Sequence, residues 1–525
     1  MTESLAELAV RALSHDPDSS LAGVAAHVAA HGPSARATAV LGFVQVLSCD
    51  FDGALISLPE ADDPLSKAMA AFISAACLAR VPEDEDVAVP DECDRGLHAF
   101  VVVEAAMSAG QIARAEELAL RFAPSLAPIA SGTFWAWNQV ALARSLAFQG
   151  RFTEARAAID LVLVDPRAGD WPAVDRIARG VQAFVAAHAG DATFAERFVA
   201  GLETEVPEPR TYMEAAAYVL AAFAEQAAGR LGQLDQLVLL GGGGRFLPRF
   251  QVVDRIYAYE MLVESALSRG ELPVAGDWLD LAEAHPVTEH GMASAAVARC
   301  RARIALAHDD PETGARESVI SAERALLVGG ALEVLRAQLL QAAATRAQGT
   351  DDVDVAGLEA VALRAANTGA RVLRAWAGRE LALRGRHLRN APGIGWEALT
   401  DRQRLVALLA AQGLRNREIG GRLFLSERTV EGHIAAVLDA LGAPSRVGIG
   451  AYVPMTSTPV PLPSLGLTPR QRSVAALVAD GSSNSAIAAA LGISEKTVEK
   501  HVSDLFVRLQ VQSRAAVAAL VRNAS

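Results

Sequence analysis

The sequence predicts an all-α protein in which a solenoid of paired helices precedes two copies of a small four-helix domain. Of the 525 residues, 51% are apolar but only 5% are aromatic, and the apolar residues are rich in Ala and Leu. This composition favours helices over sheets. Two internal repeats point the same way, one with a period of about 40 residues and one that relates position 399 to position 467. The first predicts the solenoid and the second predicts the pair of small domains.

The N-terminal region, residues 1–95, is helical in pattern but lies outside the register of the 40-residue repeat. The acidic stretch at residues 82–90 separates the two registers, and we expect it to be a loop. The first residues are acidic where a secretory signal would be basic, and prolines interrupt the longest uncharged stretch, residues 122–143. We therefore expect a cytoplasmic protein without a membrane span.

The four cysteines are far apart and form no C-x-x-C pair, so we expect no disulfide framework and no thiolate metal site.

The 40-residue repeat fills residues 96–390. Each copy starts with a small turn residue, and an Ala or another apolar residue follows five positions later. The starting residues are Gly110, Gly150, Gly190, Gly229, Gly270 and Asp310. Glycine tolerates the left-handed conformation that ends a helix, and alanine lets two helices approach closely. We therefore expect a stack of antiparallel helix pairs, similar to tetratricopeptide repeats but with a longer period.

Two features of this region have a structural and a functional interpretation. Its tryptophans are expected to pack between helices rather than to line a binding surface: Trp135, Trp137, Trp171, Trp278 and Trp376. The run Gly241–Gly244, followed by Arg245, is expected to be a loop between repeats. The alternative is that the run forms an anion-binding nest, but it lacks the Gly-Lys-Ser/Thr ending of a P-loop. The P-loop motif occurs nowhere in the sequence. The sequence therefore predicts no nucleotide cofactor.

The charge is divided unequally along the chain. Residues 396–525 carry fourteen Lys/Arg and ten Asp/Glu, a net +4, whereas the whole chain carries −13, which leaves −17 for residues 1–395. Excess positive charge at one end favours binding of a polyanion there.

That end contains one motif written twice. Residues 399–446 superpose on residues 467–514 without a gap, and 22 of the 48 aligned pairs are identical. We expect two domains, at residues 396–453 and 467–525. The segment between them, residues 454–466, is uncharged and holds four prolines, so it should be an extended spacer of about 40 Å, at ~3.1 Å per residue.

Each copy has the pattern of four helices. Thr400 and Thr468 are expected N-caps with Gln403 and Gln471 three positions on, and Pro469 stands at the favoured first helical position. A short helix opening at Asn416 or Asn484 follows, then a longer helix capped by Ser426 or Ser494, and Ser445 or Ser513 caps the last. A short helix, a tight turn and a longer helix form a helix-turn-helix, whose second helix enters the DNA major groove.

The motifs of both copies resemble the LuxR-type DNA-binding domain over its whole length. The shared pattern is Leu-Thr-x-Arg-Gln, then Gly-x-x-Asn-x-x-Ile, Leu-x-x-Ser-Glu-x-Thr-Val-Glu-x-His and Leu-x-x-x-Ser-Arg. The region before it looks like the helical repeats of MalT-like regulators. The resemblance implies double-stranded DNA as a partner, and a homodimer is one arrangement that it allows.

The resemblance also implies which residues contact DNA. Base-contacting positions would be Glu431, Gly432 and Ala435 in the first copy, and Glu499, Lys500 and Ser503 in the second. Lys500 can donate to guanine and Glu499 can accept from cytosine, whereas Gly432 and Ala435 offer no side-chain hydrogen bond. Phosphate contacts are expected from Arg415, Arg417, Arg428, Thr429, Lys496, Thr497 and Arg508. We therefore expect the second copy to recognise sequence and the first mainly to add backbone affinity.

These features predict a bacterial transcription regulator whose repeat region senses a ligand or protein partner in its groove. The alternative is an interaction scaffold held on DNA by weak, non-specific binding. His433 and His501 belong to the helical pattern and have no nucleophile or second ligand nearby, so we expect them to pack. We expect neither an enzyme nor a bound metal or cofactor.

Overall fold

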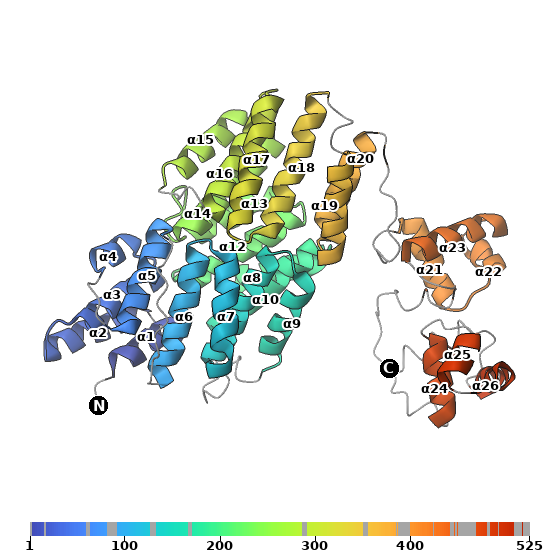
Figure 1. Ribbon diagram of the computed structural model, residues 1–525. Coiled ribbons are helices and arrows are strands. Elements are labelled where there is room, and N and C mark those ends of the chain that lie inside the picture. Colours follow the sequence, from blue (N-terminus) through green and yellow to red (C-terminus); the bar gives the residue numbers. More distant parts are fainter. Residues whose placement is uncertain are drawn as a thin grey trace. The chain divides into compact units, whose positions relative to one another are not determined.

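The computed structural model is helical throughout its regular elements, and the described residues contain no strand (Figure 1). Those residues are 3–14, 17–58, 63–80, 92–126, 133–165, 171–285, 291–349, 355–384, 386, 399–423, 425–441, 446, 449, 469–479, 484–491, 493–508 and 517. The chain divides into two compact units, Met1–Leu388, here called the body, and Arg389–Ser525, which holds two small domains, here called the heads. The prediction of an all-α fold is confirmed.

Five helices form the N-terminal part of the body. They are α1 (Leu5–Ser14), α2 (Pro17–His31), α3 (Ala35–Leu47), α4 (Phe51–Ile56) and α5 (Pro64–Leu78). Asp63 caps α5 by accepting a hydrogen bond from the Ser66 amide at 3.1 Å. Arg36 of α3 pairs with Asp63 and with Asp94, both at 2.7 Å, and so ties these helices to the first repeat. The expected loop at residues 82–90 lies outside the described residues.

Antiparallel helix pairs follow at the regular spacing that the sequence repeat predicts. The first helices of the pairs are α6 (Glu92–Ser108), α8 (Thr133–Phe148), α10 (Pro172–His188), α12 (Tyr212–Ala227), α14 (Val252–Ser268), α16 (Met292–Ala307), α18 (Ala331–Ala347) and α20 (Arg371–Leu383). The second helices are α7 (Ile112–Leu126), α9 (Phe152–Leu163), α11 (Ala192–Glu205), α13 (Leu231–Gly242), α15 (Leu272–Glu283), α17 (Pro311–Leu327) and α19 (Val355–Thr368). This is the tetratricopeptide-like solenoid that the sequence predicts.

The turn inside each pair has the conformation that its glycine permits. Gly110, Gly150, Gly190, Gly229 and Gly270 have φ of +71°, +74°, +88°, +73° and +73°. The residues five positions later are fully buried, at 0% exposure: Ala115, Ala155, Ala195, Leu234 and Ala275.

The sixth copy was predicted one residue too late. Its left-handed residue is Asp309, with φ +60°, and Asp310 is instead the N-cap of α17, which accepts from the Thr313 amide at 3.1 Å. Gly314 therefore occupies the close-contact position, and a Cβ there would lie 2.9 Å from Leu306. The prediction used Ala315, which is only half-buried. A glycine in place of alanine at this contact hid the register.

The glycine run at the end of α13 is only partly a loop. Gly241 and Gly242 end α13, and Gly243 and Gly244 then take φ of +79° and +108°. A Cβ on Gly241 would lie 2.4 Å from the Cβ of Tyr218, so the helical glycine is needed for close packing. The predicted loop therefore begins two residues later than expected.

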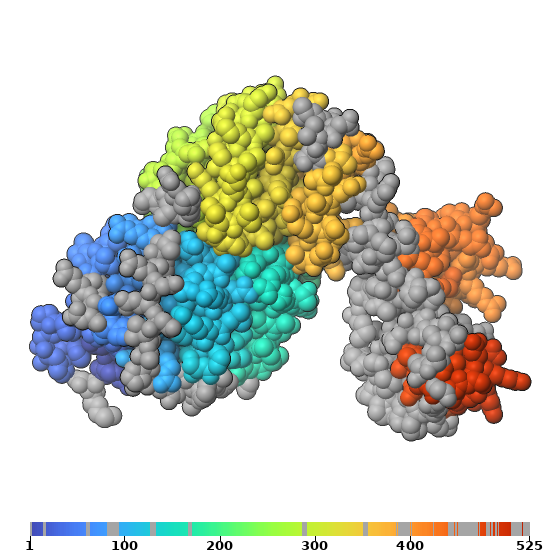
Figure 2. Space-filling model, viewed as in Figure 1, coloured from blue at the N-terminus to red at the C-terminus, as the bar shows by residue number. Residues whose placement is uncertain are grey.

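The solenoid winds tightly enough for early and late repeats to touch. The Ala113 amide of α7 donates to the Val328 carbonyl after α17 at 3.1 Å, and Arg371 of α20 donates to the Ala189 carbonyl after α10 at 3.2 Å, across 182 residues of sequence. In Figure 1, α6 to α10 lie beside α16 to α20, and in the space-filling view their surfaces meet without a gap on this face (Figure 2). The repeats thus close on one another.

Aromatic side chains from successive first helices converge inside this winding. Phe148, Phe184, Phe223 and Tyr257 come from α8, α10, α12 and α14, and their ring centroids lie 5.2 to 6.2 Å from one another along the chain of contacts. Trp137 is buried, and the four other tryptophans of the body pack partly buried against the core, as expected. A cavity of about 30 Å³ remains beside Phe148 and Phe223.

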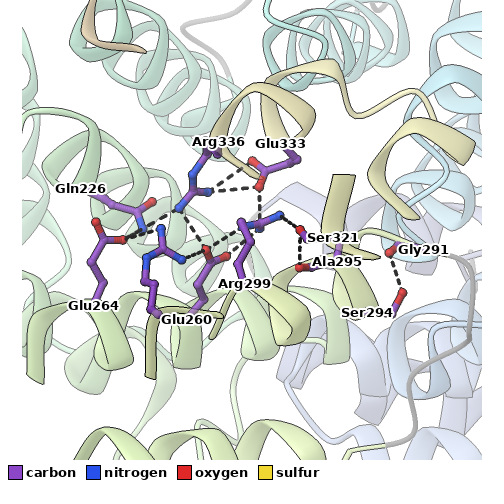
Figure 3. A network of polar contacts seen from close by, with 11 residues as sticks. Gln226, Glu260, Glu264, Gly291, Ser294, Ala295, Arg299, Ser321, Glu333 and Arg336 are labelled. Atoms are coloured by element: carbon purple, nitrogen blue, oxygen red, sulfur yellow. Dashed lines mark hydrogen bonds and ion pairs between the residues drawn. The ribbon is translucent and has the colours of Figure 1, made fainter. Parts of the chain in front are cut away.

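A buried ionic cluster joins three successive first helices. Arg299 of α16 is fully buried and forms a two-pronged pair with Glu260 of α14, at 2.8 and 2.7 Å, and a pair with Glu333 of α18 at 2.5 Å (Figure 3). Arg303 and Arg336 also contact Glu260, at 2.8 and 3.2 Å. Burial alone would raise the pKa of Glu260, but Arg299 and Arg336 outweigh it and hold this pKa well below its usual range. The cluster, called the arginine cluster below, locks these helices together.

Candidate nucleic-acid interface

Each head has the helix-turn-helix arrangement. The first contains α21 (Asp401–Ala411), α22 (Asn416–Leu423) and α23 (Glu427–Leu441), and the second contains α24 (Pro469–Ala479), α25 (Asn484–Leu491) and α26 (Glu495–Arg508). Their cores are separate and equivalent, because eight of the nine core residues of the first head have a core residue at the aligned position of the second. The first core includes Val406, Ile419, Val430, Val437 and Ile449, and the second includes Val474, Ile487, Val498, Leu505 and Val517. The predicted spacer at residues 454–466 lies outside the described residues, as do the predicted fourth helices apart from these last core residues and Arg446.

Local capping positions the first helix of each head. Thr400 accepts from the Gln403 amide at 3.3 Å while the Gln403 side chain accepts from the Thr400 amide at 2.8 Å, which is the predicted capping box. Helix α21 ends before Gly413, whose φ is +88°. In the second head Thr468 lies outside the described residues, but α24 begins at Pro469 as expected.

A tight turn sets the angle between the second and third helices. In the first head the Leu425 amide donates to the Gly420 carbonyl at 2.9 Å, and a Cβ on Gly420 would lie 2.6 Å from the Leu425 carbonyl oxygen. In the second head the equivalent bond joins Ile493 to Ala488 at 3.1 Å. The turn is thus kept in both copies, although only the first has the glycine.

A serine and a threonine together close the N-terminus of the third helix. Ser426 accepts from the Thr429 amide at 3.1 Å, and its hydroxyl lies 2.6 Å from the Thr429 hydroxyl. Ser494 and Thr497 repeat both contacts, at 3.2 and 2.8 Å. The threonines predicted as phosphate contacts therefore also belong to the cap. The helix N-terminus that they stabilise carries partial positive charge, which favours an adjacent phosphate.

The third helix of the first head has one buried and one exposed face. Val430, Ile434 and Val437 are buried. The predicted base-contacting residues Glu431, Gly432 and Ala435 are all exposed on the opposite side, together with Arg428. The structure therefore brings them to one face, on which Gly432 and Ala435 have no side-chain hydrogen-bonding group.

The third helix of the second head presents a more polar face. Val498, Val502 and Leu505 are buried, whereas Glu499, Lys500 and Ser503 are exposed on the other side, with Lys496 beside them. Among the described residues Lys500 forms no ion pair, so its ammonium group is available to a base edge. At the predicted base-contacting positions, this face offers a donor, an acceptor and a hydroxyl, whereas the first head offers only the carboxylate of Glu431.

The predicted phosphate contacts are distributed unequally between the heads. Arg415, Arg417 and Arg428 are exposed in the first head, and Lys496 is exposed in the second. Arg508 ends α26, but the position of its side chain lies outside the description. The prediction missed Arg422, which is also exposed on α22 and is equivalent to Ala490. Its basic character was the available signal.

Two arginines of the shared motif donate hydrogen bonds within their own head. Arg446 donates to the Asn416 side chain and to the Leu414 carbonyl, and burial lowers its pKa. It thus holds the C-terminal segment against the start of α22. Arg402 donates in the same way to the Leu423 carbonyl at the end of α22. The basic residues of the motif are therefore not all DNA contacts.

The histidines of the motif lie half-buried beside the core, which fits packing. His433 and His501 follow Val430 and Val498 by three residues on α23 and α26. Within the described part of the chain, no group of three or more His, Cys, Asp or Glu side chains could hold a metal ion. No helix there is long and apolar enough to span a bilayer.

Comparison with known families decides what these domains are. Residues 397–453 and 465–521 each match the model of bacterial regulatory proteins of the luxR family. Both heads are luxR-type domains. An HTH-type transcriptional regulator of Mycobacterium tuberculosis, Rv0890c, is 48% identical over 66 residues, and the transcriptional regulatory protein YhcZ of Bacillus subtilis is 52% identical over 52 residues.

These matches concern a small part of each protein. They cover 13% and 10% of this chain, and 8% and 24% of the respective relatives. Over 70% of this chain, the crystal structure of the APC/C hetero-tetramer Cut9-Hcn1 aligns with 11% identity and a TM-score of 0.27, and 90% of that chain is covered. The luxR relationship therefore applies to the heads.

Proposed function

We propose that the chain is a DNA-binding transcriptional regulator whose body senses a ligand or protein partner. The observation that carries the DNA-binding role is the repeated third helix, which is capped, anchored by its apolar face and exposed on its polar face in both luxR-type heads. A capped helix with a free polar face is what the major groove admits. Regulation rather than catalysis is the chemistry that this arrangement supports.

The two heads take unequal parts in this proposal. Lys500, Glu499 and Ser503 give the second head hydrogen-bonding groups for base edges. The first head has Arg415, Arg417 and Arg422 on and beside α22, where they can neutralise phosphates, but mostly small groups on α23. We infer that the second head supplies sequence preference and the first supplies backbone affinity.

The body is the proposed sensor because helical-repeat folds commonly serve as binding scaffolds. Its tight winding and its internal aromatic cluster leave a cavity of only about 30 Å³ beside Phe148 and Phe223. A ligand or partner is therefore expected at the margins of the winding rather than along its axis.

Selection of DNA from a random library by the full chain tests the regulator proposal. Recovery of one common motif, protected in a footprint, is the expected result. Recovery of unrelated sequences that bind with equal, strongly salt-dependent affinity would instead indicate the scaffold alternative, in which the heads only hold the protein on DNA.

A further inference from the structure

A pocket lies where the N-terminal helices meet the repeats. It has a volume of about 130 Å³ and is lined from α1, α2 and α3 on one side and from α10 and α12 on the other. Leu13, Leu47 and Met213 are buried and form its apolar wall. Pro172 is exposed, so the pocket reaches the surface beside it. We call it the seam pocket.

Among the residues that the structure describes, one charged group in the seam pocket has no counter-ion. Arg176 of α10 lines the pocket, and its Nε atom is buried without a hydrogen-bond partner. Among the described residues its guanidinium forms no ion pair either. Arg179, one turn further along α10, pairs in contrast with Asp175 at 2.9 Å. An arginine whose Nε is shielded from water and unpaired leaves N–H donors and a positive charge without a partner, which favours binding of an anion beside it.

The acid that shares the pocket is already occupied. Glu214 lines the opposite wall, but its carboxylate accepts from the Arg210 and Thr211 amides at 2.7 and 3.2 Å and completes the cap of α12. It therefore serves the positive end of its own helix rather than Arg176.

Two helices begin at the pocket. Pro172 begins α10 and Pro17 begins α2, and both line the pocket. Helix N-termini favour anions, but each of these ends already carries an acid in its first turn, Asp18 in α2 and Asp175 in α10, so the preference for an anion depends on Arg176.

We infer that the seam pocket binds a small organic monocarboxylate with a compact apolar body. Its carboxylate would pair with Arg176, and its apolar part would contact Leu13, Leu47 and Met213. The pocket is slightly smaller than the cavity of about 150 Å³ that holds benzene, so the apolar body must be compact, and the carboxylate would lie toward the opening beside Pro172. Since the pocket joins the N-terminal helices to the repeats, a bound ligand stabilises that junction. This inference rests on the proposed function and gives its sensing role a site and a ligand class.

The direct test is calorimetric titration of the full chain with benzoate as the probe. We expect binding with a dissociation constant on the order of millimolar or tighter, accompanied by a rise in melting temperature. Benzamide, which has the same shape without the charge, and inorganic phosphate, which has the charge without the apolar body, should both bind at least about tenfold more weakly.

Variants of neighbouring residues locate the site. Arg176→Gln should weaken benzoate binding by roughly 10- to 100-fold, whereas the matched control Arg179→Gln should leave it unchanged. Ala173→Leu should also weaken binding, because it fills the pocket without altering charge. If Arg176→Gln fails to fold, the Ala173→Leu variant shows whether benzoate binds in the seam pocket.

The outcomes separate this inference from the proposed function. No benzoate binding, equal binding by Arg176→Gln, or equal binding of benzamide or phosphate would each overturn the seam pocket as a carboxylate site. Benzoate binding that depends on Arg176 supports the site. If such binding leaves the DNA affinity of the full chain unchanged, the site stands while the sensing role fails.

Discussion

Replacement of Arg299 by methionine should strongly destabilise the body. Arg299 is fully buried, contacts Glu260 through two hydrogen bonds and Glu333 through a third, and also donates to Ser321 at 3.3 Å. The arginine cluster contains three arginines and three glutamates, with Glu264 at its edge, so it is electrically neutral. A methionine side chain would fill a similar volume but leave one negative charge uncompensated.

The expected cost follows from that uncompensated charge. Removal of one partner from a buried ion pair costs about 3 to 5 kcal/mol. Arg303 and Arg336 still contact Glu260, so the lower half of this range is expected. Adding Glu333→Gln restores neutrality, and the double variant should therefore be more stable than the sum of the two single effects by about 1 to 2 kcal/mol.

Urea unfolding followed by tryptophan fluorescence measures the effect on the body, because five of the six tryptophans lie in it. Arg301→Met is the matched control. Arg301 is on the same helix but is 42% exposed, and its pair with Glu283 at 2.7 Å should contribute at most about 1 kcal/mol. A cost for Arg299→Met no larger than that for Arg301→Met would refute the reasoning.

Three further predictions concern the heads and the pH response. Lys500→Ala should lower the preference for one base pair by about 1 to 3 kcal/mol, whereas Arg417→Ala should weaken binding to all sequences and reduce the slope of log affinity against log salt concentration by about 0.9. Competition against operator variants at several salt concentrations separates the two effects. An unchanged ranking of the operator variants for Lys500→Ala would contradict our groove assignment. Deletion of residues 396–453 should weaken operator binding severalfold and shorten the footprint, because two tethered heads meet their sites at an effective concentration on the order of millimolar. An unaltered footprint and affinity would contradict this prediction. Burial lowers the pKa of His188 to about 4, so the unfolded chain takes up its proton first and stability should fall by roughly 3 kcal/mol between pH 6.5 and 4. His188→Gln should flatten that fall in urea titrations, and parallel pH profiles of the two proteins would show that His188 is not its cause.

The local features of the fold were predictable because they depend on neighbouring residues. The turn at Gly229 and the cap at Thr400 each follow from one residue type at one position. The closure of the solenoid does not follow from any single residue. The contact between Ala113 and Val328 depends on the accumulated rotation of all intervening repeats, which no local pattern encodes.

The same distinction applies to the heads and to the arginine cluster. The apolar face of α26 fixes which side of that helix is exposed, so the position of Lys500 could be predicted. The inward role of Arg446 could not, because a basic residue in a DNA-binding motif has the same sequence signature whether it contacts phosphate or a buried carbonyl. Arg299 likewise gives no sign in the sequence that Glu260 is its partner, 39 residues away.

The most direct test of the central claim is the ratio of specific to non-specific DNA binding by the full chain. The measurement compares a motif obtained by selection with its scrambled counterpart, at an ionic strength of about 150 mM, where non-specific phosphate contacts are weakened. We expect a ratio of about 10³ or more, typical of specific DNA-binding proteins, and a loss of at least about tenfold in that ratio for Lys500→Ala. Equal affinity for the two sequences would contradict it.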